Sequence, residues 1–141
     1  MKRTLMLVLG ITMMTVGTTW ASPDTDQLTA PARSASQATW TAFSSQLVDA
    51  LQGDHAGMQQ GALQHVIQYR DYVSVDAAAF DIVRIYRNHE DDNMRRMAVV
   101  ALGAMENRWA MDYLKRAERF EKSEAVKATI QAVLTQYRRA A

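Results

Sequence analysis

Residues 89–92 read His-Glu-Asp-Asp and are the densest group of side chains in the chain that could do chemistry. An imidazole beside carboxylates can bind a divalent metal ion, and neighbouring carboxylates can serve as general acid and general base. The surrounding sequence has neither a His-Glu-x-x-His motif nor a calcium-loop motif, and the chain has no cysteine. We therefore interpret these residues as an acidic turn at the start of a helix. We predict no metal site, and metal binding by this cluster is the less favoured alternative.

Nucleophilic catalysis has as little support in the sequence as metal chemistry. After residue 45 the serines are Ser74 and Ser123, and both stand where a helix is expected to begin. The chain has no Gly-x-Ser-x-Gly motif and no glycine-rich phosphate loop. We predict that the protein is not an enzyme, with no catalytic residue and no cofactor.

Residues 1–21 have the three parts of a secretory signal peptide. Lys2 and Arg3 precede an uncharged apolar segment, and Thr19-Trp20-Ala21 places small residues at the −3 and −1 positions of a cleavage site. An uncleaved membrane anchor is the weaker alternative, because the strongly apolar run is shorter than the ~20 residues that a membrane-spanning helix needs. We predict export to the periplasm or the extracellular space, with no stable membrane span after cleavage.

The charge of the chain is nearly balanced but unevenly distributed. Removing Lys2 and Arg3 leaves 14 basic against 15 acidic residues, a net charge of −1, which gives no indication of nucleic-acid binding. From Arg108 to the end, eight basic residues stand against four acidic ones, whereas residues 22–107 have six against eleven. Solvated helix faces are the simplest explanation. Attraction of the basic end to an acidic partner or an anionic surface is the alternative.

The part of the chain after residue 21 divides into a leader and a helical domain. Residues 22–38 contain both prolines and no aromatic residue, which predicts a flexible leader. Residues 39–141 lack proline and carry apolar residues at three- and four-residue spacing, which predicts an all-α domain. The expected helices span 39–52 and 55–72, followed by four that end near residues 88, 105, 121 and 138. The expected caps of these four are Ser74 or Asp76, Asp92 or Asn93, Asn107, and Ser123.

Three of these helices align with one another. Residues 58–66, 94–102 and 126–134 carry apolar side chains at their first, fifth and ninth places, at shifts of 36 and 32 residues. Self-similarity at this period is typical of a helical solenoid, in which about three stacked helix pairs bury one continuous core. We predict a short right-handed α-solenoid of about three antiparallel helix pairs.

The second aligned helix resembles the HEAT-like repeat family. The stretch MRRMAVVALG at 94–103, preceded by two aspartates, is similar to the second-helix pattern of these repeats. The resemblance covers roughly residues 46–137 and is looser in the outer units, where Gln59 and Lys127 stand at the arginine position. It implies that Arg95 turns back to Asp91 or Asp92 and holds the corner between two helices. A degenerate pattern of this kind indicates a fold far better than a function.

The resemblance also implies a binding surface made by the second helix of each pair. We expect Arg96 to face solvent or a partner, because it stands about 100° round the helix from Arg95. Arginine is also enriched at binding hot spots, which makes Arg96 the first candidate. We predict an exported protein-interaction or scaffold module, expected to be a monomer, that binds a protein or peptide and no nucleic acid. The candidate partner-binding residues are Arg96, Arg95, Gln59, Gln60, Lys127, Gln131 and Trp109.

Two functions of another class stay open. A ligand carrier or a lyase-like enzyme built on similar repeats would need a deep pocket lined by a histidine or a carboxylate with apolar walls. A self-associating envelope protein would use the apolar end of the last unit, although the polar C-terminal sequence QYRRAA argues against it.

Most large apolar side chains are expected in the core. Trp109 is the exception that the sequence singles out, because it opens the fifth helix and can pack against Tyr113 or between units. Methionines 58, 94, 97, 105 and 111 are expected to be internal. The aromatic residues expected in the core are Trp40, Phe43, Phe80, Tyr86, Tyr113 and Phe120.

Overall fold

The computed structural model describes residues 35–140, and this part of the chain is all-helical, with no strand. The predicted signal peptide and residues 22–34 of the predicted leader lie outside the described residues. None of the described helices is both long and apolar enough to cross a membrane. The elements are α2 (Gln37–Gln52), α3 (Ala56–Gln68), the 3₁₀ turn η1 (Asp76–Ala78), α4 (Ala79–Asn88), α5 (Asp92–Ala104), α6 (Arg108–Ala117), the 3₁₀ turn η2 (Glu118–Phe120) and α7 (Glu124–Ala140).

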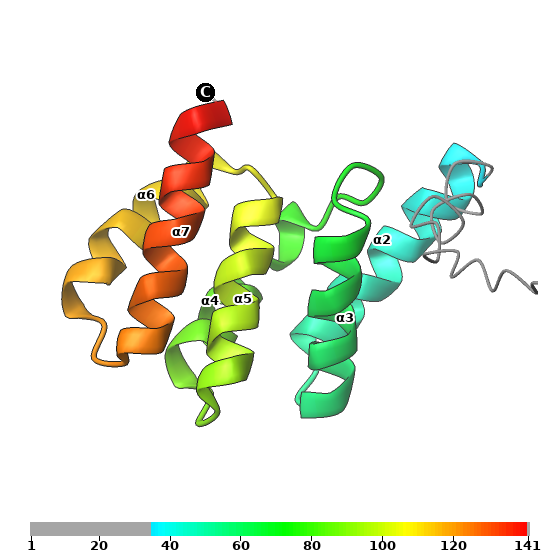
Figure 1. Cartoon of the computed structure of the whole chain (residues 1–141). Coiled ribbons are helices and arrows are strands. Elements are labelled where there is room, and N and C mark those ends of the chain that lie inside the picture. Colours follow the sequence, from blue (N-terminus) through cyan, green and yellow to red (C-terminus); the bar gives the residue numbers. More distant parts are fainter. Residues whose placement is uncertain (1–34, 141) are drawn as a thin grey trace, which may run out of the picture.

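The helices lie in two layers around α5. Figure 1 shows α3, α5 and α7 side by side, and α5 contacts both of the others. Helices α2, α4 and α6 lie on the other side of this row, where α2 packs on α3, α4 on α5, and α6 on both α5 and α7. Helix α5 is therefore the centre of the core, and its side chains Ala98, Val99, Ala101 and Leu102 are fully buried.

Several helices are capped at the N-terminus by a polar side chain that accepts a hydrogen bond from a free backbone N–H group. Asn107 Oδ1 accepts from the N–H of Trp109 at 2.9 Å, and Ser123 Oγ from that of Val126 at 3.4 Å, as expected. Helix α5 is capped by Asp91, whose Oδ1 accepts from the N–H of Asn93 at 2.8 Å, and not by Asp92 or Asn93. Because Asp91 is the cap, the Asp92 carboxylate is available for other contacts.

Several expected helix boundaries are wrong by a few residues. Helix α2 begins at Gln37 with Ser36 as its cap, so it takes in the end of the expected leader. Helix α3 ends at Gln68, and the chain turns through residues 69–72, which were expected to be helical. Before α4, neither Ser74 nor Asp76 caps a helix. Instead Ser74 Oγ bonds to the Asp76 carboxylate at 3.3 Å, and η1 leads into α4.

The repeating apolar positions are buried in the three aligned helices with two exceptions, Met58 at the first place of α3 and the half-buried Leu134 at the ninth place of α7. Met94 and Val126, at the first place, are 5% and 0% exposed, whereas Met58 is 58% exposed. Gln59, the next residue, is buried in its stead. One residue is a rotation of about 100° around a helix, so α3 turns a different side chain inward at its first turn.

Two aromatic side chains expected in the core are on the surface. Phe80 is 71% exposed and Phe120 is 82% exposed. Phe80 lies outside the apolar face of α4 that follows the i, i+3, i+4 and i+7 spacing. The buried residues of this helix are Ala79, Ile82, Val83 and Tyr86, which make that face, and Ile85. Phe120 lies in η2, where the helical spacing of α6 has already ended.

Gly103 allows α5 and α7 to approach closely. A Cβ atom at this position would lie 2.6 Å from Cγ1 of Val133 on α7, a distance that side chains do not tolerate. Gly103, the last residue of the aligned motif in α5, is therefore needed for the close packing of α5 against α7.

Candidate functional site

Two of the expected partner-binding residues have structural roles instead. Gln59 is 8% exposed, and its Nε2 donates to the carbonyl oxygen of Gly53 at 2.6 Å. Arg95, at the aligned place in α5, donates from Nε to the carbonyl oxygen of Tyr86 at 2.9 Å. Each side chain ties a second helix to the end of the helix before it. The expectation that Gln59 is exposed is therefore wrong, because the unpaired carbonyls at a helix end attract this donor.

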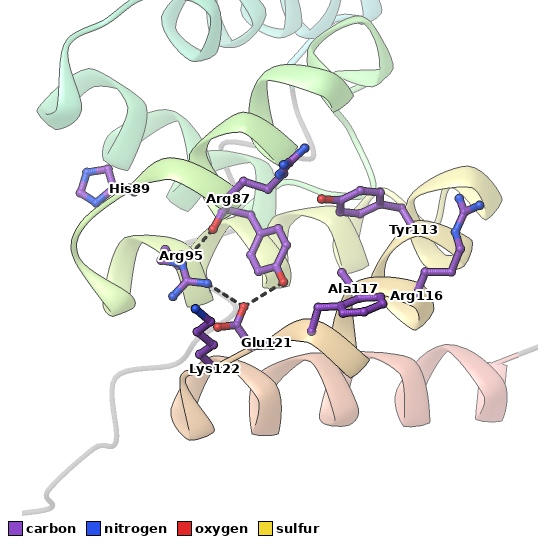
Figure 2. A pocket seen from close by; sticks show the side chains of 10 residues that line it. Arg87, His89, Arg95, Tyr113, Arg116, Ala117, Glu121 and Lys122 are labelled. Atoms are coloured by element: carbon purple, nitrogen blue, oxygen red, sulfur yellow. Dashed lines mark hydrogen bonds and ion pairs between the residues drawn. The ribbon is translucent and has the colours of Figure 1, made fainter.

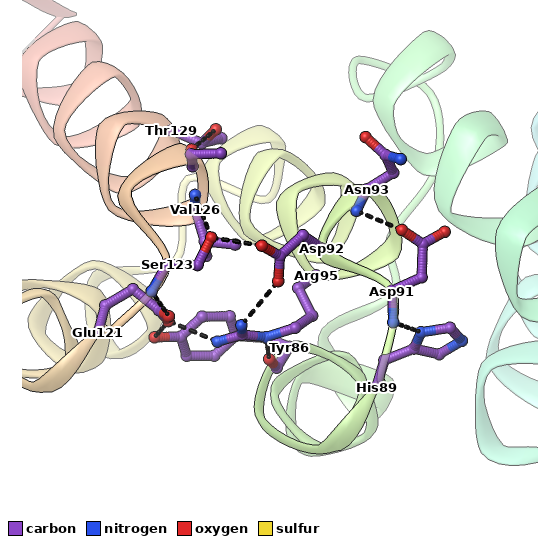
Figure 3. A network of polar contacts seen from close by, with 11 residues as sticks. Tyr86, His89, Asp91, Asp92, Asn93, Arg95, Glu121, Ser123, Val126 and Thr129 are labelled. Carbon is purple, nitrogen blue, oxygen red and sulfur yellow. Dashed lines mark hydrogen bonds and ion pairs between the residues drawn. The ribbon is translucent and has the colours of Figure 1, made fainter.

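Arg95 is the centre of a polar network that joins α4, α5 and the segment before α7 (Figure 3). Its Nη1 pairs with Asp92 Oδ1 at 3.0 Å, as the resemblance implied, and its Nη2 pairs with Glu121 Oε2 at 2.6 Å. The same Glu121 oxygen accepts from the Tyr86 hydroxyl at 2.9 Å. The other oxygen accepts from the N–H of Ser123 at 3.0 Å, and the Ser123 hydroxyl bonds to Asp92.

Burial and hydrogen bonding set the charges of this network. Burial by itself would raise the pKa of Glu121, but the Ser123 N–H, the Arg95 guanidinium and the Tyr86 hydroxyl together hold it below its ordinary 4.5. Burial and the hydrogen bond to Glu121 raise the pKa of Tyr86 far above its ordinary 10.0. The hydroxyl of Ser123 and the guanidinium of Arg95 lower the pKa of Asp92. At neutral pH Glu121 is thus an ionised, nearly buried carboxylate with every donor supplied from within the chain.

The other expected residues are spread over four helices and form no single site. Gln60 is exposed on α3, and Lys127 is half-buried on α7. Arg96 is exposed, but its Nε donates to Oγ1 of Thr129 at 3.0 Å. Gln131 Nε2 donates to Oε1 of Glu118 at 2.9 Å. The exposed polar groups of α5 and α7 are thus used partly to hold these helices to their neighbours.

A large pocket lies on the other layer, between α4 and α6. It is open, has a volume of about 680 Å³, and is walled by Tyr113, Ala117 and Phe120 as well as by charged side chains. Figure 2 shows Tyr113 and Arg116 at one end of the view and Arg95, Glu121 and Lys122 at the other. We call this pocket the α4–α6 groove. Its lining is Tyr86, Arg87, His89, Arg95, Tyr113, Arg116, Ala117, Phe120, Glu121 and Lys122.

The groove carries an excess of positive charge. Among residues 35–140, Arg95 and Glu121 neutralise each other, whereas no ion pair is formed by Arg87, Arg116 or Lys122. Arg87 and Arg116 lie in the last turns of α4 and α6, where cations oppose the negative end of the helix dipole. Three cations from three segments therefore face one opening without an acidic partner.

A row of aromatic rings extends the groove along the surface. Phe80 on α4 tilts against Trp109 on α6 with ring centroids 4.7 Å apart, and Trp109 stacks on Tyr113 at 5.9 Å, as expected from their spacing. Trp109 remains 38% exposed. Tyr113 lines the groove itself, so the aromatic row and the charged pocket are continuous.

Sequence reasoning missed most of the groove: Arg95 was a candidate and His89 was considered as a metal ligand, but the other lining residues were assigned to the core or not singled out. Only Trp109 among the candidates lies in the aromatic row. A signal was present: Phe80 stands about 100° from Ala79 on the helix, outside the complete i, i+3, i+4, i+7 face. The sequence does not indicate that Arg87 and Lys122 line one groove. They do so because α4 packs against the segment after η2.

The His-Glu-Asp-Asp cluster at residues 89–92 forms the turn that leads into α5. His89 Nδ1 accepts a hydrogen bond from the N–H of Asp91 at 3.0 Å, and Asp91 caps α5. Within the described part of the chain, no three histidine or acidic side chains come together as metal ligands would.

Comparison with known proteins adds no identity to this geometry. No family model, no curated protein and no solved structure matches the chain. Function is therefore inferred from the molecule itself.

Proposed function

We propose that the chain is a short HEAT-like right-handed α-solenoid of about three antiparallel helix pairs. The sequence separation of its polar contacts supports the repeat. Ser44 bonds to the N–H of Ser74, Arg84 to the carbonyl of Gln52, Asn107 to Asp76, Ser123 to Asp92 and Arg96 to Thr129, at separations of 30, 32, 31, 31 and 33 residues. Contacts that recur at one repeat length are what stacking of neighbouring units produces.

We propose further that this solenoid is a non-enzymatic interaction module and that its partner binds at the α4–α6 groove. The observation that carries the proposal is the exposure of Phe80, Trp109 and Phe120 next to three cations that form no ion pair within residues 35–140. Exposed apolar clusters rimmed by charge mark interaction surfaces. Tryptophan and arginine are also the residue types that dominate binding hot spots.

Site-specific photocrosslinking in the producing cell tests the proposal. A photoreactive phenylalanine analogue replaces Phe120 in the groove, and in a matched control it replaces Met58, which is exposed on α3. We expect a covalent adduct of defined mass from position 120 and none from position 58.

Three outcomes would contradict the proposed function. Adducts at neither position would leave the groove without a partner. Equal adducts at both positions would mean non-specific contact. An adduct from position 120 to the chain's own residues 22–34 or to a second copy would replace the external partner with a contact of the protein with itself.

Export by a cleaved signal peptide belongs to the same proposal. Amino-terminal sequencing of the protein recovered from the producing cell is expected to begin at Ser22. A mature chain that still begins at Met1 would contradict cleavage.

The groove also favours a second candidate function, a carrier of a small ligand. A volume of about 680 Å³ falls within the range typical of small-molecule sites. Native mass spectrometry of protein purified from its own cells would show an added small mass under this alternative. The interaction module predicts the mass of the bare chain.

A further inference from the structure

We infer that the α4–α6 groove takes an acidic peptide segment, one in which carboxylates alternate with at least one large apolar side chain. This inference rests on the proposed function and names the class of partner. It follows from three properties of the groove: the placement of its cations, its shape, and its aromatic walls.

The cations are spaced along the groove and do not converge on one point. Arg116 lies at one end in Figure 2, Lys122 lies at the other, and Arg87 comes from the opposite helix. Glu121, the acidic residue among them, is 3% exposed and already accepts from Arg95 and Tyr86. A ligand with separated carboxylates can reach all three cations, and guanidinium groups bind carboxylates in a two-pronged geometry.

The shape of the groove favours a chain over a small anion. A pocket of about 680 Å³ is far larger than one carboxylate or phosphate requires, and it continues into the row formed by Tyr113, Trp109 and Phe80. The three cations come from three segments and are spread along the groove, which suits a ligand with several separated carboxylates. An extended segment can follow the groove and lay an apolar side chain on the row.

The aromatic walls supply the apolar part of the recognition. Phe120 is 82% exposed beside Ala117 at the pocket wall, so an apolar side chain of the partner would remove ring surface from water. Trp109 is 38% exposed and its ring is held between Phe80 and Tyr113. A rigid aromatic platform loses little conformational freedom when a partner binds.

Selection from a random peptide library tests the inference, because it needs no partner to be chosen in advance. The purified protein serves as bait, with counter-selection on the double variant Arg87→Glu, Arg116→Glu. The matched control is Arg138→Glu, Arg139→Glu, which makes the same change in net charge on exposed positions of α7, away from the groove. Lys122→Glu is a second groove variant, placed in a loop where helix formation is not at stake.

We expect the selected peptides to be enriched in Asp and Glu beside Leu, Phe or Trp. Their binding, followed by the fluorescence anisotropy of a dye on the peptide, is expected to weaken about tenfold or more in each groove variant and to change little in the control. It is also expected to weaken as salt is raised, because exposed charge pairs are screened. Circular dichroism of each variant checks that the helices are retained.

Other results would overturn the inference and separate it from the proposed function. Selected peptides without an excess of acidic residues, or acidic peptides that bind the groove variants equally well, would overturn the acidic peptide. Binding to phosphatidylglycerol vesicles through the groove, with no peptide selected, would assign a membrane ligand instead. If photocrosslinking at position 120 captures a partner while acidic peptides fail, the interaction module stands and its partner class is wrong. If both fail, both proposals fall.

Discussion

At the scale of single residues, Glu121 holds three segments of the structure together, a role that its position in the sequence does not indicate. Its carboxylate lies at the end of η2 and joins a tyrosine of α4 to an arginine of α5. A carboxylate with a 3% exposed side chain is stable only when its charge is compensated, and Arg95 supplies the opposite charge at 2.6 Å. Removing this carboxylate would leave three donors, the Arg95 guanidinium, the Tyr86 hydroxyl and the Ser123 N–H, without their charged acceptor.

Glu121→Gln is expected to lower the free energy of unfolding by about 2 kcal/mol, because hydrogen bonds to charged groups contribute about 1.5–3 kcal/mol each and the amide keeps some of them. Urea denaturation at pH 7 measures the change. Glu90→Gln is the control, since Glu90 is exposed before α5, and its effect should stay within about 0.5 kcal/mol. Equal effects of the two changes would contradict a structural role for the network.

The pH dependence of stability should change with the same substitution. The pKa of Glu121 is lowered in the folded protein, so the unfolded chain binds this proton more readily and stability rises with pH. The advantage of the wild type over Glu121→Gln is expected to be complete above about pH 5.5 and to shrink as the pH falls below the unfolded value of 4.5. Urea titrations at several pH values test this, and a constant difference between pH 7 and pH 3 would contradict it.

At the scale of helices, the packing of α7 on α5 depends on one missing side chain. Val133 approaches the Cα of Gly103 so closely that a Cβ atom would meet Cγ1 at 2.6 Å. Valine has little χ1 freedom in a helix and cannot turn away. Gly61 in α3 differs in this respect, because a Cβ atom there would meet nothing within 4 Å.

The two glycines should respond to alanine with opposite signs. Gly103→Ala is expected to destabilise the protein by about 1–2 kcal/mol, since overpacking outweighs the gain in helix propensity. Gly61→Ala is expected to stabilise it by about 0.5–1 kcal/mol, since only the propensity gain remains. Thermal and urea unfolding measure both. Val133→Ala should relieve part of the cost of Gly103→Ala, and failure to do so would place the strain elsewhere.

At the scale of the whole molecule, each layer of the fold depends on its neighbour for burial. Helix α7 covers α5 with Val126 and Ile130, both fully buried. Each such side chain contributes about 1.5–3 kcal/mol, a large part of the 5–15 kcal/mol typical of a domain. Charge is also distributed at this scale. The basic stretch after Arg108 supplies Arg116 and Lys122 to the groove, while Arg87 comes from the acidic part of the chain.

A chain that ends at Glu106 is therefore expected to lose its cooperative thermal transition. It would lack α6 and α7, and the apolar face of α5 would meet water. Circular dichroism during heating measures the transition. Removal of residues 139–141 is the control and should leave Tm within about 2 °C, because Arg139 and Ala140 are exposed. A sharp transition in the shorter chain would show that α2–α5 are sufficient.

From the amino-acid sequence alone, the helical class and the approximate extent of most helices could be predicted, and the resemblance to HEAT-like repeats implied that Arg95 pairs with Asp91 or Asp92. These features are local: spacing of three and four residues reports which face is apolar, and caps act within one turn. The predicted cap of α5, Asp92 or Asn93, lies one or two residues after the true cap Asp91, because these neighbouring side chains can all cap a helix and only backbone geometry tells them apart.

Only the tertiary structure decided which polar and aromatic side chains remain in contact with water. Gln59 and Arg95 turn inward because each finds a carbonyl at the end of the preceding helix, while Phe80 and Phe120 stay exposed because no helix covers them. The groove joins Arg87, Arg116 and Lys122 from segments that are separated in sequence. Periodicity describes the faces of one helix at a time. A surface shared by several helices is set by how closely they pack, here by Gly103 against Val133 and by Glu121 between α4 and α5.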